Sequence, residues 1–443
     1  MDTDARPLGR QPGATPAGTQ ASPGRDVPGR YKAYLSRGRG KLGEMFGGHV
    51  EVDSYGATVR TADGREFLNC GGYGVFLAGA RHPRVVAAVE RQLHRHPLAT
   101  RLLLEPKAAD AAEALVRVAP AGLERVHFTN SGAEAVETAL KLARAHDHRR
   151  IVSTAGGFHG KTLGALTATG KPLYRDPFLP LLPDTVHVPY GDAAALREAL
   201  GPDGSDAVVL VEPVQSEAGV VVPPDGYLRA VAAACADAGA FFVLDEVMTG
   251  LGRLGHWWGA DREAVTPDVL LVGKALSGGV VPVAAAVATA RAFAPFDRDP
   301  FLHTSTFSAA PLAMAAAEAA VAVVEEEGLV GRAAGLGATL LGALRNLVAR
   351  HCGHLVRDVR GLGLLIGVEF QDAGLAGEFL LELLERDVIA NHSLNAHTVV
   401  RLTPPAVLDD AETDRLTEAL EGAARALGER FPAARPQPDP GGN

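Results

Sequence analysis

The amino-acid sequence predicts an α/β fold with a mostly parallel central sheet and a second, smaller α+β domain. Several segments, among them 207–214 (AVVLVEPV) and 240–247 (AFFVLDEV), are continuously apolar, as strands buried on both faces are. Helical stretches separate these segments, which favours parallel strands joined by helices. From about residue 320 onward the pattern changes to long helices with fewer apolar strands, which indicates the second domain.

The expected strands of the larger domain follow one another along the chain. They cover residues 125–130, 150–154, 207–214, 240–247, 269–275 and 282–289. Helical stretches alternate with them, such as 132–145 and 227–238. Apolar runs of this length bounded by turn residues are typical of buried strands.

The smaller domain begins with long helices. Helices are expected over 312–326, 332–351 and 376–386, and strands over 363–370 and 398–404. We therefore expect a large domain over 96–320 and a C-terminal small domain over 321–430. Residues 1–30 and 431–443 are rich in Pro and Gly and are expected to form a flexible extension and a flexible tail.

Composition excludes several classes of function. Hydrophobic residues make up 47% and charged residues 21% of the 443 residues, as in an ordinary globular protein. The net charge of −9 argues against general nucleic-acid binding, although a local positive pocket could still hold a small anion. No apolar run reaches the ~18 residues of a membrane span, and the N-terminus lacks the apolar core of a signal peptide.

The cysteines and histidines suggest neither disulfides nor a metal. Cys70, Cys235 and Cys352 are widely spaced, so they predict no disulfide framework and no CxxC site. No His/Cys cluster supports a metal ion. A reducing, cytoplasmic location is therefore expected.

Polar residues follow the expected strands, at the edge where open parallel sheets bind ligands. After strand 125–130, Ser131-Gly132-Ala133-Glu134 has the S-x-x-E spacing of a capping box that opens a helix. The free N–H groups and positive dipole of such a terminus suit a phosphate. A plain N-cap is the alternative interpretation.

A glycine-rich segment, AGGFHGKT, follows strand 150–154. Its glycines let the backbone approach a ligand closely, and Phe158 and His159 offer flat faces for stacking. A turn with a phenylalanine in the core is the alternative interpretation of this segment.

Carboxylates and one lysine follow the next strands. Glu212 and Glu217 lie at the end of the expected strand 207–214, beyond its apolar residues, and Asp245 follows the apolar run 241–244. A buried carboxylate needs a partner, which is either a salt bridge or a protonated heterocyclic nitrogen. Lys274 ends another apolar run, where burial favours its neutral, nucleophilic form.

Taken together, these groups match what pyridoxal 5′-phosphate (PLP) requires. That cofactor needs a lysine for its aldehyde, an aspartate for its pyridinium nitrogen and a helix terminus for its phosphate. Each motif is weak alone, but four in succession at strand ends are a strong signal.

Seven segments of the sequence form a recognisable set: NSGAEAVETALKLAR, GGFHGKTLGAL, VEPVQSEAGV, LDEVMTGLGRLG, GKALSGG, HTSTFSAAPLAMAAA and RGLGLLIGVEF. On these segments the chain resembles the class III (omega) aminotransferases of PLP fold type I, over roughly residues 45 to 428. Within that family it looks most similar to putrescine aminotransferases, and then to ornithine and acetylornithine aminotransferases.

The resemblance assigns roles around the cofactor. It implies that Lys274 bonds the cofactor aldehyde and later moves a proton, and that Asp245 keeps the ring nitrogen protonated. Phe158 would stack on the ring. The other implied contacts to the cofactor are Ser131, Gly132 and Ala133 at the phosphate, together with His159, Glu212 and Met248.

The resemblance also implies a homodimer with shared active sites. Thr306 matches the threonine that reaches the phosphate in the neighbouring subunit. Residues 31–95 would contribute to the small domain and to the substrate channel, where Tyr73 matches a channel aromatic.

Further matches concern the substrate. Arg401 matches the arginine that grips the α-carboxylate of an amino or oxo acid, and Glu217 matches the glutamate that pairs with that arginine when a substrate lacks this carboxylate. Lys161 replaces an arginine that grips a distal carboxylate in 4-aminobutyrate-type enzymes. This replacement favours an amino donor that has no distal carboxylate.

Three departures from the family pattern leave the substrate open. Met248 stands where a glutamine often hydrogen-bonds the ring oxygen, and a thioether cannot donate. Ser216 replaces a usual glycine, and residues 308–311 read SAAP in place of GGNP.

The expected activity is a ping-pong transamination. A primary amine, such as a diamine or ω-amino compound, would give an aldehyde, and 2-oxoglutarate would become glutamate, or the reverse. The divergent site is compatible with a specialised biosynthetic pathway. Two alternatives stay open, a class III amino-acid racemase or epimerase and a non-catalytic PLP-binding regulator.

Overall fold

The computed structural model describes residues 26–433, which divide into two compact units. The described part of the first unit comprises residues 26–53 and 60–65, and the second comprises 54–59 and 66–433. The first unit contains α1 (Val27–Tyr34) and α2 (Arg37–Met45), which begin at the capping side chains of Asp26 and Ser36. Strands β1 (Glu51–Tyr55) and β2 (Thr58–Thr61) cross the division between the units.

The terminal segments fall largely outside the described residues. The expected extension 1–30 lies outside them up to residue 25, and α1 already begins at Val27, inside the range expected to be flexible. Of the expected tail 431–443, residues 434–443 lie outside them. Among residues 26–433, no helix combines the length and the apolar character needed to cross a bilayer.

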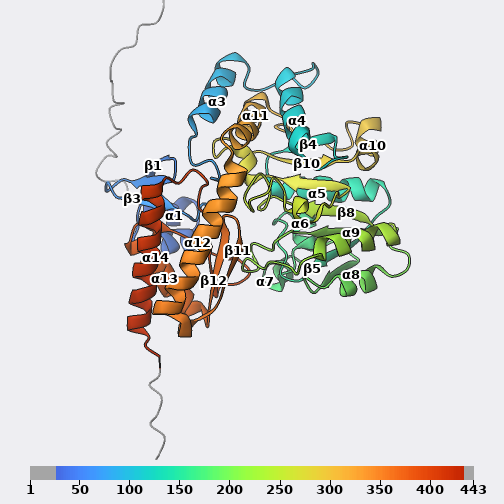
Figure 1. The fold of residues 1–443 in the computed structure, drawn as a ribbon. Helices are drawn as coiled ribbons and strands as arrows, with labels where there is room; N and C mark the ends of the chain where they lie inside the picture. The colour runs from blue at the N-terminus through green and yellow to red at the C-terminus, as the bar shows by residue number, and fades with distance from the viewer. Residues whose placement is uncertain (1–25, 434–443) are drawn as a thin grey trace, which may run out of the picture. The chain divides into compact units, whose positions relative to one another are not determined.

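A seven-stranded sheet forms the centre of the larger part of the second unit (Figure 1). Its strand order is β4-β10-β9-β8-β7-β5-β6. The pairs from β9 through β8, β7 and β5 to β6 are parallel, whereas β10 runs antiparallel to both neighbours. The expectation of a mostly parallel sheet is confirmed. The strands are β4 (Arg125–Thr129), β5 (Arg150–Thr154), β6 (Thr185–Val188), β7 (Ala207–Val211), β8 (Phe241–Asp245), β9 (Val269–Val272) and β10 (Ala284–Ala288).

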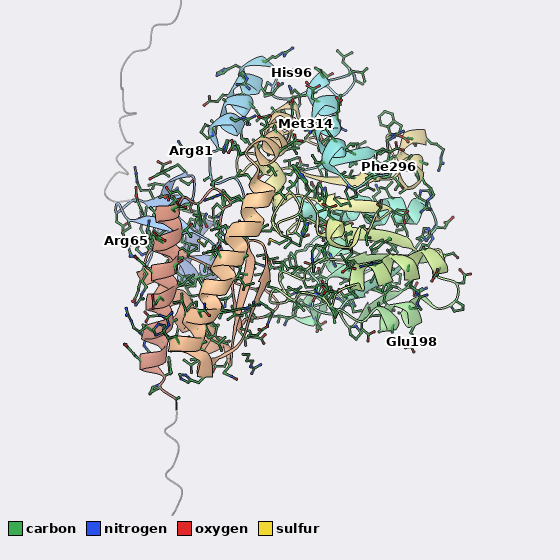
Figure 2. The ribbon with its side chains drawn as sticks, in the orientation of Figure 1. Arg65, Arg81, His96, Glu198, Phe296 and Met314 are labelled. Carbon is green, nitrogen blue, oxygen red and sulfur yellow. The ribbon has the colours of Figure 1, made fainter. Side chains whose placement is uncertain are left out.

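Helices cover both faces of this sheet, which explains the continuous apolar strands. Along β7, Val208 and Leu210 face one core, and Val209 and Val211 face the other. Phe296 and Met314 belong to these opposite cores (Figure 2). The first face packs against α5 (Gly132–Ala145), α6 (Leu163–Ala168) and α10 (Ala290–Arg298), and the second against α4 (Pro106–Val118), α8 (Ala193–Leu200), α9 (Tyr227–Ala238) and α11 (Pro311–Glu326).

The C-terminal part of the second unit is built around a smaller antiparallel sheet of order β11-β12-β15-β14. Three helices pack beside it, coloured orange to red in Figure 1. This α+β arrangement agrees with the expected smaller domain. Its elements are α12 (Leu329–His351), β11 (Val356–Leu362), β12 (Leu365–Phe370), α13 (Ala373–Glu385), β14 (Asn391–His392), β15 (Val399–Leu402) and α14 (Asp410–Arg430). The remaining elements are β3 (Glu66–Asn69), which pairs with β13 (Val388–Ile389), α3 (Pro83–Arg95) and α7 (Pro172–Arg175).

Several element boundaries differ from the expected ones. Strands expected over 207–214 and 269–275 end at Val211 and Val272. Lys274 therefore lies beyond its strand, at the start of a 3-10 turn (Lys274–Ser277), with a φ of 42°. The expected domain boundary at 320/321 lies inside α11.

Candidate active site

A cavity of about 520 Å³ lies where the parallel strands of the large sheet end. Most of the residues expected to bind a cofactor line it, and they come from the turns that follow β4, β5, β7, β8 and β9. The lining includes Ser131, Gly132, Ala133, Phe158, His159, Glu212, Glu217, Asp245, Met248 and Lys274. These side chains are therefore close enough to act on one ligand.

Helix α5 begins at this cavity. Ser131 is its N-cap, and its Oγ accepts a hydrogen bond from the N–H of Glu134. The carboxylate of Glu134 in turn accepts a hydrogen bond from the N–H of Asn130 at 2.6 Å. The first N–H groups of a helix have no partner within it, so Gly132 and Ala133 present free donors at the cavity wall.

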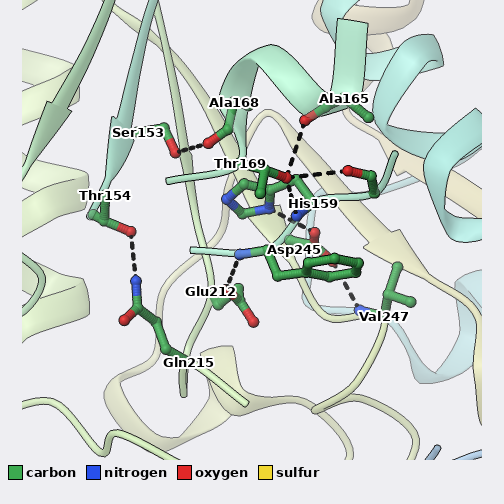
Figure 3. Close-up of polar contacts among 12 residues, drawn as sticks. Ser153, Thr154, His159, Ala165, Ala168, Thr169, Glu212, Gln215, Asp245 and Val247 are labelled. Carbon is green, nitrogen blue, oxygen red and sulfur yellow. Dashed lines mark hydrogen bonds and ion pairs between the residues drawn. The ribbon is translucent and has the colours of Figure 1, made fainter. Parts of the chain in front are cut away.

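Asp245 and His159 form a buried pair at the base of the cavity (Figure 3). The Nδ1 of His159 lies 2.8 Å from Asp245 Oδ2, and the N–H of Val247 donates to Asp245 Oδ1. Thr169 fixes the histidine backbone, because its Oγ1 accepts the N–H of His159 at 3.0 Å. Asp245 is 5% exposed, so its carboxylate is held with little access to water.

Glu212 is a second buried carboxylate on the cavity wall. Its Oε1 accepts the N–H of Phe158 at 3.0 Å, which anchors the segment that carries Phe158. Burial raises the pKa of Glu212 to about 7, and the nearby charge of Asp245 acts in the same direction. Beside it, Gln215 donates to Thr154 Oγ1 and joins the ends of two neighbouring strands (Figure 3).

Lys274 reaches the same cavity from the end of β9. Within the described part of the chain, no hydrogen bond or ion pair holds its Nζ. Burial lowers the pKa of Lys274, although the carboxylates of Glu217 and Asp245 oppose this shift. A lysine of this kind is suited to act as a nucleophile.

Arg401 and Glu217 form a second buried pair. Arg401 Nη1 lies 2.8 Å from Glu217 Oε1 and donates to Ser216 Oγ at 2.8 Å. Arg401 does not line the cavity itself, but Glu217 and Ser216 do. Among residues 26–433, the buried Nε and Nη2 atoms of Arg401 have no hydrogen-bond partner. The guanidinium therefore keeps donors that a carboxylate could use.

Besides Arg401, three expected residues are not among those that line the cavity. Tyr73 is half-exposed and has a positive φ of 53°. Lys161 lies over the ring of Tyr174, with its Nζ 4.2 Å from the ring centroid. Thr306 is exposed on the surface of this single chain.

The cavity also has lining residues that the sequence did not single out. These are Val75, Asn130, Val247 and a segment after the lysine, with Ser277, Gly279, Val280, Val281, Pro282 and Val283. Of these, only Asn130 carried a recognisable signal, because it directly precedes the capping box. In the described residues, no group of three or more side chains is arranged to hold a metal ion.

The donor set of the cavity fits PLP. An unpaired lysine Nζ, a buried carboxylate and a helix N-terminus with two small residues surround one volume of about 520 Å³. Gly132 is required at this terminus, because a Cβ there would come within 2.9 Å of Val247. Phe158 provides an aromatic wall beside Asp245.

Comparison with known proteins gives one family. The family described as "Aminotransferase class-III" matches residues 48–424. Among solved structures, an ornithine aminotransferase from Toxoplasma gondii with PLP at partial occupancy in its active site is 31% identical, with a TM-score of 0.80, and the match covers 86% of this chain and 91% of that one. An (S)-enantioselective omega-transaminase from Thermomicrobium roseum is 30% identical, with a TM-score of 0.79 and coverage of 86% and 93%. The ornithine delta-aminotransferase of Plasmodium falciparum is 31% identical, with a TM-score of 0.75 and coverage of 86% and 94%.

Proposed function

Because the chain belongs to the class III aminotransferases, a PLP-dependent family, we propose that it moves an amino group between a primary amine and 2-oxoglutarate in a ping-pong cycle. The amine would be a diamine or an ω-amino compound, converted to an aldehyde, and the acid product would be glutamate. The observation that carries this proposal is the buried Arg401–Glu217 pair beside Lys274.

The residues of the cavity have distinct tasks in this proposal. When bound, PLP supplies an aldehyde for the amine and a ring that accepts electrons from the reacting carbon. Lys274 would bond that aldehyde in the resting enzyme and then carry the proton between the two reacting carbons. Asp245, oriented by His159, would hold the ring nitrogen protonated, and Phe158 would pack on the ring.

The two substrates place opposite demands on Arg401. An oxo acid needs the guanidinium free, because a bidentate contact to its carboxylate is a strong and specific interaction. An amine without that carboxylate needs the buried cation neutralised, because an unpaired buried charge is costly. Glu217 meets the second demand in this structure, with Oε1 2.8 Å from Arg401 Nη1. The pair is closed in this structure, as an amine requires, and an oxo acid would have to open it. This arrangement supports a transaminase with two kinds of substrate.

The variant Arg401→Gln tests this assignment. We expect kcat/KM for 2-oxoglutarate to fall about 100-fold, because a buried charge-assisted contact to the carboxylate is lost. The amine half-reaction should change much less. Arg197→Gln, which removes an exposed guanidinium paired with Asp237, is the matched control.

Separate single-turnover assays of the two half-reactions make this measurement. Conversion of PLP to pyridoxamine phosphate with glutamate would support transamination over racemisation. Loss of both half-reactions to the same extent in Arg401→Gln would contradict the substrate role of Arg401, and racemisation of an amino acid without amino transfer would contradict the proposed function.

We also propose that the enzyme is a homodimer with shared active sites. Leu102, Leu103 and Leu104 are exposed, and so are Phe301 and Phe307 near Thr306. Arg101 joins these two segments through the carbonyl oxygens of Ser305 and Ser308. A clustered apolar surface of this kind is typical of an interface. We propose that a second copy covers it, so that Thr306 of each copy reaches the cavity of the other.

The variant Leu103→Glu is expected to shift the protein from dimer to monomer, because a buried unpaired carboxylate destabilises an interface. Activity and PLP retention should fall with the dimer fraction. Light scattering after size-exclusion chromatography measures this change. Phe178→Glu, at another exposed apolar side chain, is the control. A monomeric wild-type protein with full activity would contradict shared sites.

A further inference from the structure

Glu217 accepts hydrogen bonds from two backbone N–H groups in addition to its ion pair with Arg401. Its Oε1 pairs with Arg401, while its Oε2 accepts the N–H of Leu394 at 2.8 Å. Its backbone carbonyl accepts the N–H of Asn395 at 2.9 Å. Both oxygens of the carboxylate are therefore engaged whenever the pair with Arg401 is closed.

The two backbone N–H groups that hold Glu217, those of Leu394 and Asn395, belong to the same β-hairpin as Arg401. Arg401 lies on β15, which pairs with β14 on one side and β12 on the other. Leu394 and Asn395 lie in the turn between β14 and β15. Arg401 is thus fixed inside a sheet, whereas the turn that holds Glu217 is connected to that sheet only at its ends.

The start of α7 also contacts this turn, through Tyr174 of the helix and Lys171 at its N-cap. The hydroxyl of Tyr174 donates to the carbonyl of Leu394 at 2.9 Å, and Lys171 Nζ donates to the carbonyl of Asn395 at 2.7 Å. We call Lys171 and Tyr174 the α7 clamp. Lys161, which is expected at the substrate, packs over the ring of Tyr174.

We infer that the α7 clamp sets how readily Glu217 leaves Arg401, and so sets the balance between carboxylate and amine substrates. This inference rests on the proposed function of the Arg401–Glu217 pair. Lys171 and Tyr174 are positioning residues, because neither lines the cavity. They act on Leu394 and Asn395: the carbonyl of Leu394 accepts the hydroxyl of Tyr174, and the N–H of Asn395 donates to the backbone carbonyl of Glu217. The N–H of Leu394 is the group that holds the Glu217 carboxylate.

The direction of the effect follows from the geometry. In the closed pair, the N–H of Leu394 stabilises the glutamate position that occupies Arg401. A loosened turn weakens that hydrogen bond and makes departure of Glu217 less costly. Carboxylate substrates, which must displace Glu217, then bind more tightly, while amines, which need the closed pair, bind less tightly.

The variant Tyr174→Phe in the holoenzyme tests the inference. We expect KM for 2-oxoglutarate to fall about fivefold, the usual effect of one net hydrogen bond, and KM for the amine to rise. The maximal rates of both half-reactions should stay near those of the wild type. Lys171→Met should act in the same direction, and Lys171→Arg, which keeps a donor, should restore part of the wild-type ratio.

Two controls separate positioning from general damage. Tyr227→Phe removes a buried hydroxyl that has no hydrogen-bond partner in the part of the chain that the structure describes, so it should leave the KM ratio unchanged. In a Glu217→Gln background the charged pair is absent, so Tyr174→Phe should no longer alter the ratio. Equal changes of both KM values, or the same change in the Glu217→Gln background, would overturn the inference.

Equilibrium binding keeps this test independent of turnover. Glutarate is a non-reacting dicarboxylate, and its Kd for the holoenzyme should fall in Tyr174→Phe by the same factor as KM for 2-oxoglutarate. Absence of transamination by the wild type with every amine tried would refute the proposed function. An unchanged glutarate Kd in Tyr174→Phe would refute the clamp, whether or not the wild type is active.

Discussion

The variant Lys274→Ala is expected to lose about 10⁴-fold in turnover, because one side chain supplies both the nucleophile and the mobile proton. Its Nζ is unpaired in the described residues, and burial lowers its pKa. No other lysine lines the cavity, as far as the structure describes it, so no neighbour can replace the lost amine. Single-turnover rates with glutamate measure the loss.

The fold should survive this substitution. Lys274 has a φ of 42°, a conformation that costs a non-glycine residue free energy, and alanine meets the same cost without new strain. Lys107→Ala, at a lysine paired with Glu318 outside the cavity, is the control. A small primary amine added to Lys274→Ala should restore part of the proton transfer. Unchanged turnover of every amine by Lys274→Ala would show that another residue is the nucleophile.

The variant Asp245→Asn is expected to lower kcat about 10³-fold, the usual effect of removing one preorganised electrostatic contact. Asparagine keeps the size of the side chain but removes the charge that would hold the ring nitrogen protonated. The amide can still contact His159, whose Nδ1 lies 2.8 Å from Asp245 Oδ2. The loss should therefore reflect charge more than packing.

Spectra and kinetics together test the Asp245 assignment. The absorbance of bound PLP should change in Asp245→Asn, while the unfolding temperature of the apoprotein should shift little. Asp206→Asn removes an exposed carboxylate paired with Arg150 and serves as the control. A kcat within tenfold of the wild type would be incompatible with the proposed role of Asp245.

Helices were easier to predict from the sequence than strand ends. Helices over 132–145 and 227–238 have the expected bounds, because Ser131 caps the start of the first and glycines flank both ends of the second. Strand 207–214 was predicted three residues too long. Glu212, Pro213 and Val214 are buried, but they lie beyond the last residue of β7 that pairs with a neighbouring strand. An apolar pattern indicates burial and does not distinguish paired from unpaired residues. The short elements β3 and β13 carry too few residues for any pattern to indicate them.

The cofactor side of the site was easier to predict than the substrate side. Asp245 ends one strand of the large sheet, and Ser131 and Lys274 follow two other strands of it, so topology places them at one edge. The contact between Leu394 and Glu217 joins residues 177 positions apart and uses a backbone N–H, which no residue type reveals. Lys161 follows His159 closely in sequence, yet its side chain packs on Tyr174, because a local motif does not fix where a long side chain points.

The position of Arg401 separates the proposed choice of carboxylate substrate from the spacing of Asp245 and Lys274. An engineer would want to vary these two properties independently. Asp245 and Lys274 extend from neighbouring strands of the seven-stranded sheet, so their spacing is set within one rigid framework. Arg401 belongs to the other sheet, and its partner Glu217 follows β7 of the first. If Arg401 binds the substrate carboxylate as proposed, carboxylate selection depends on how the two sheets pack together. It could then evolve through packing changes that leave Asp245 and Lys274 in place.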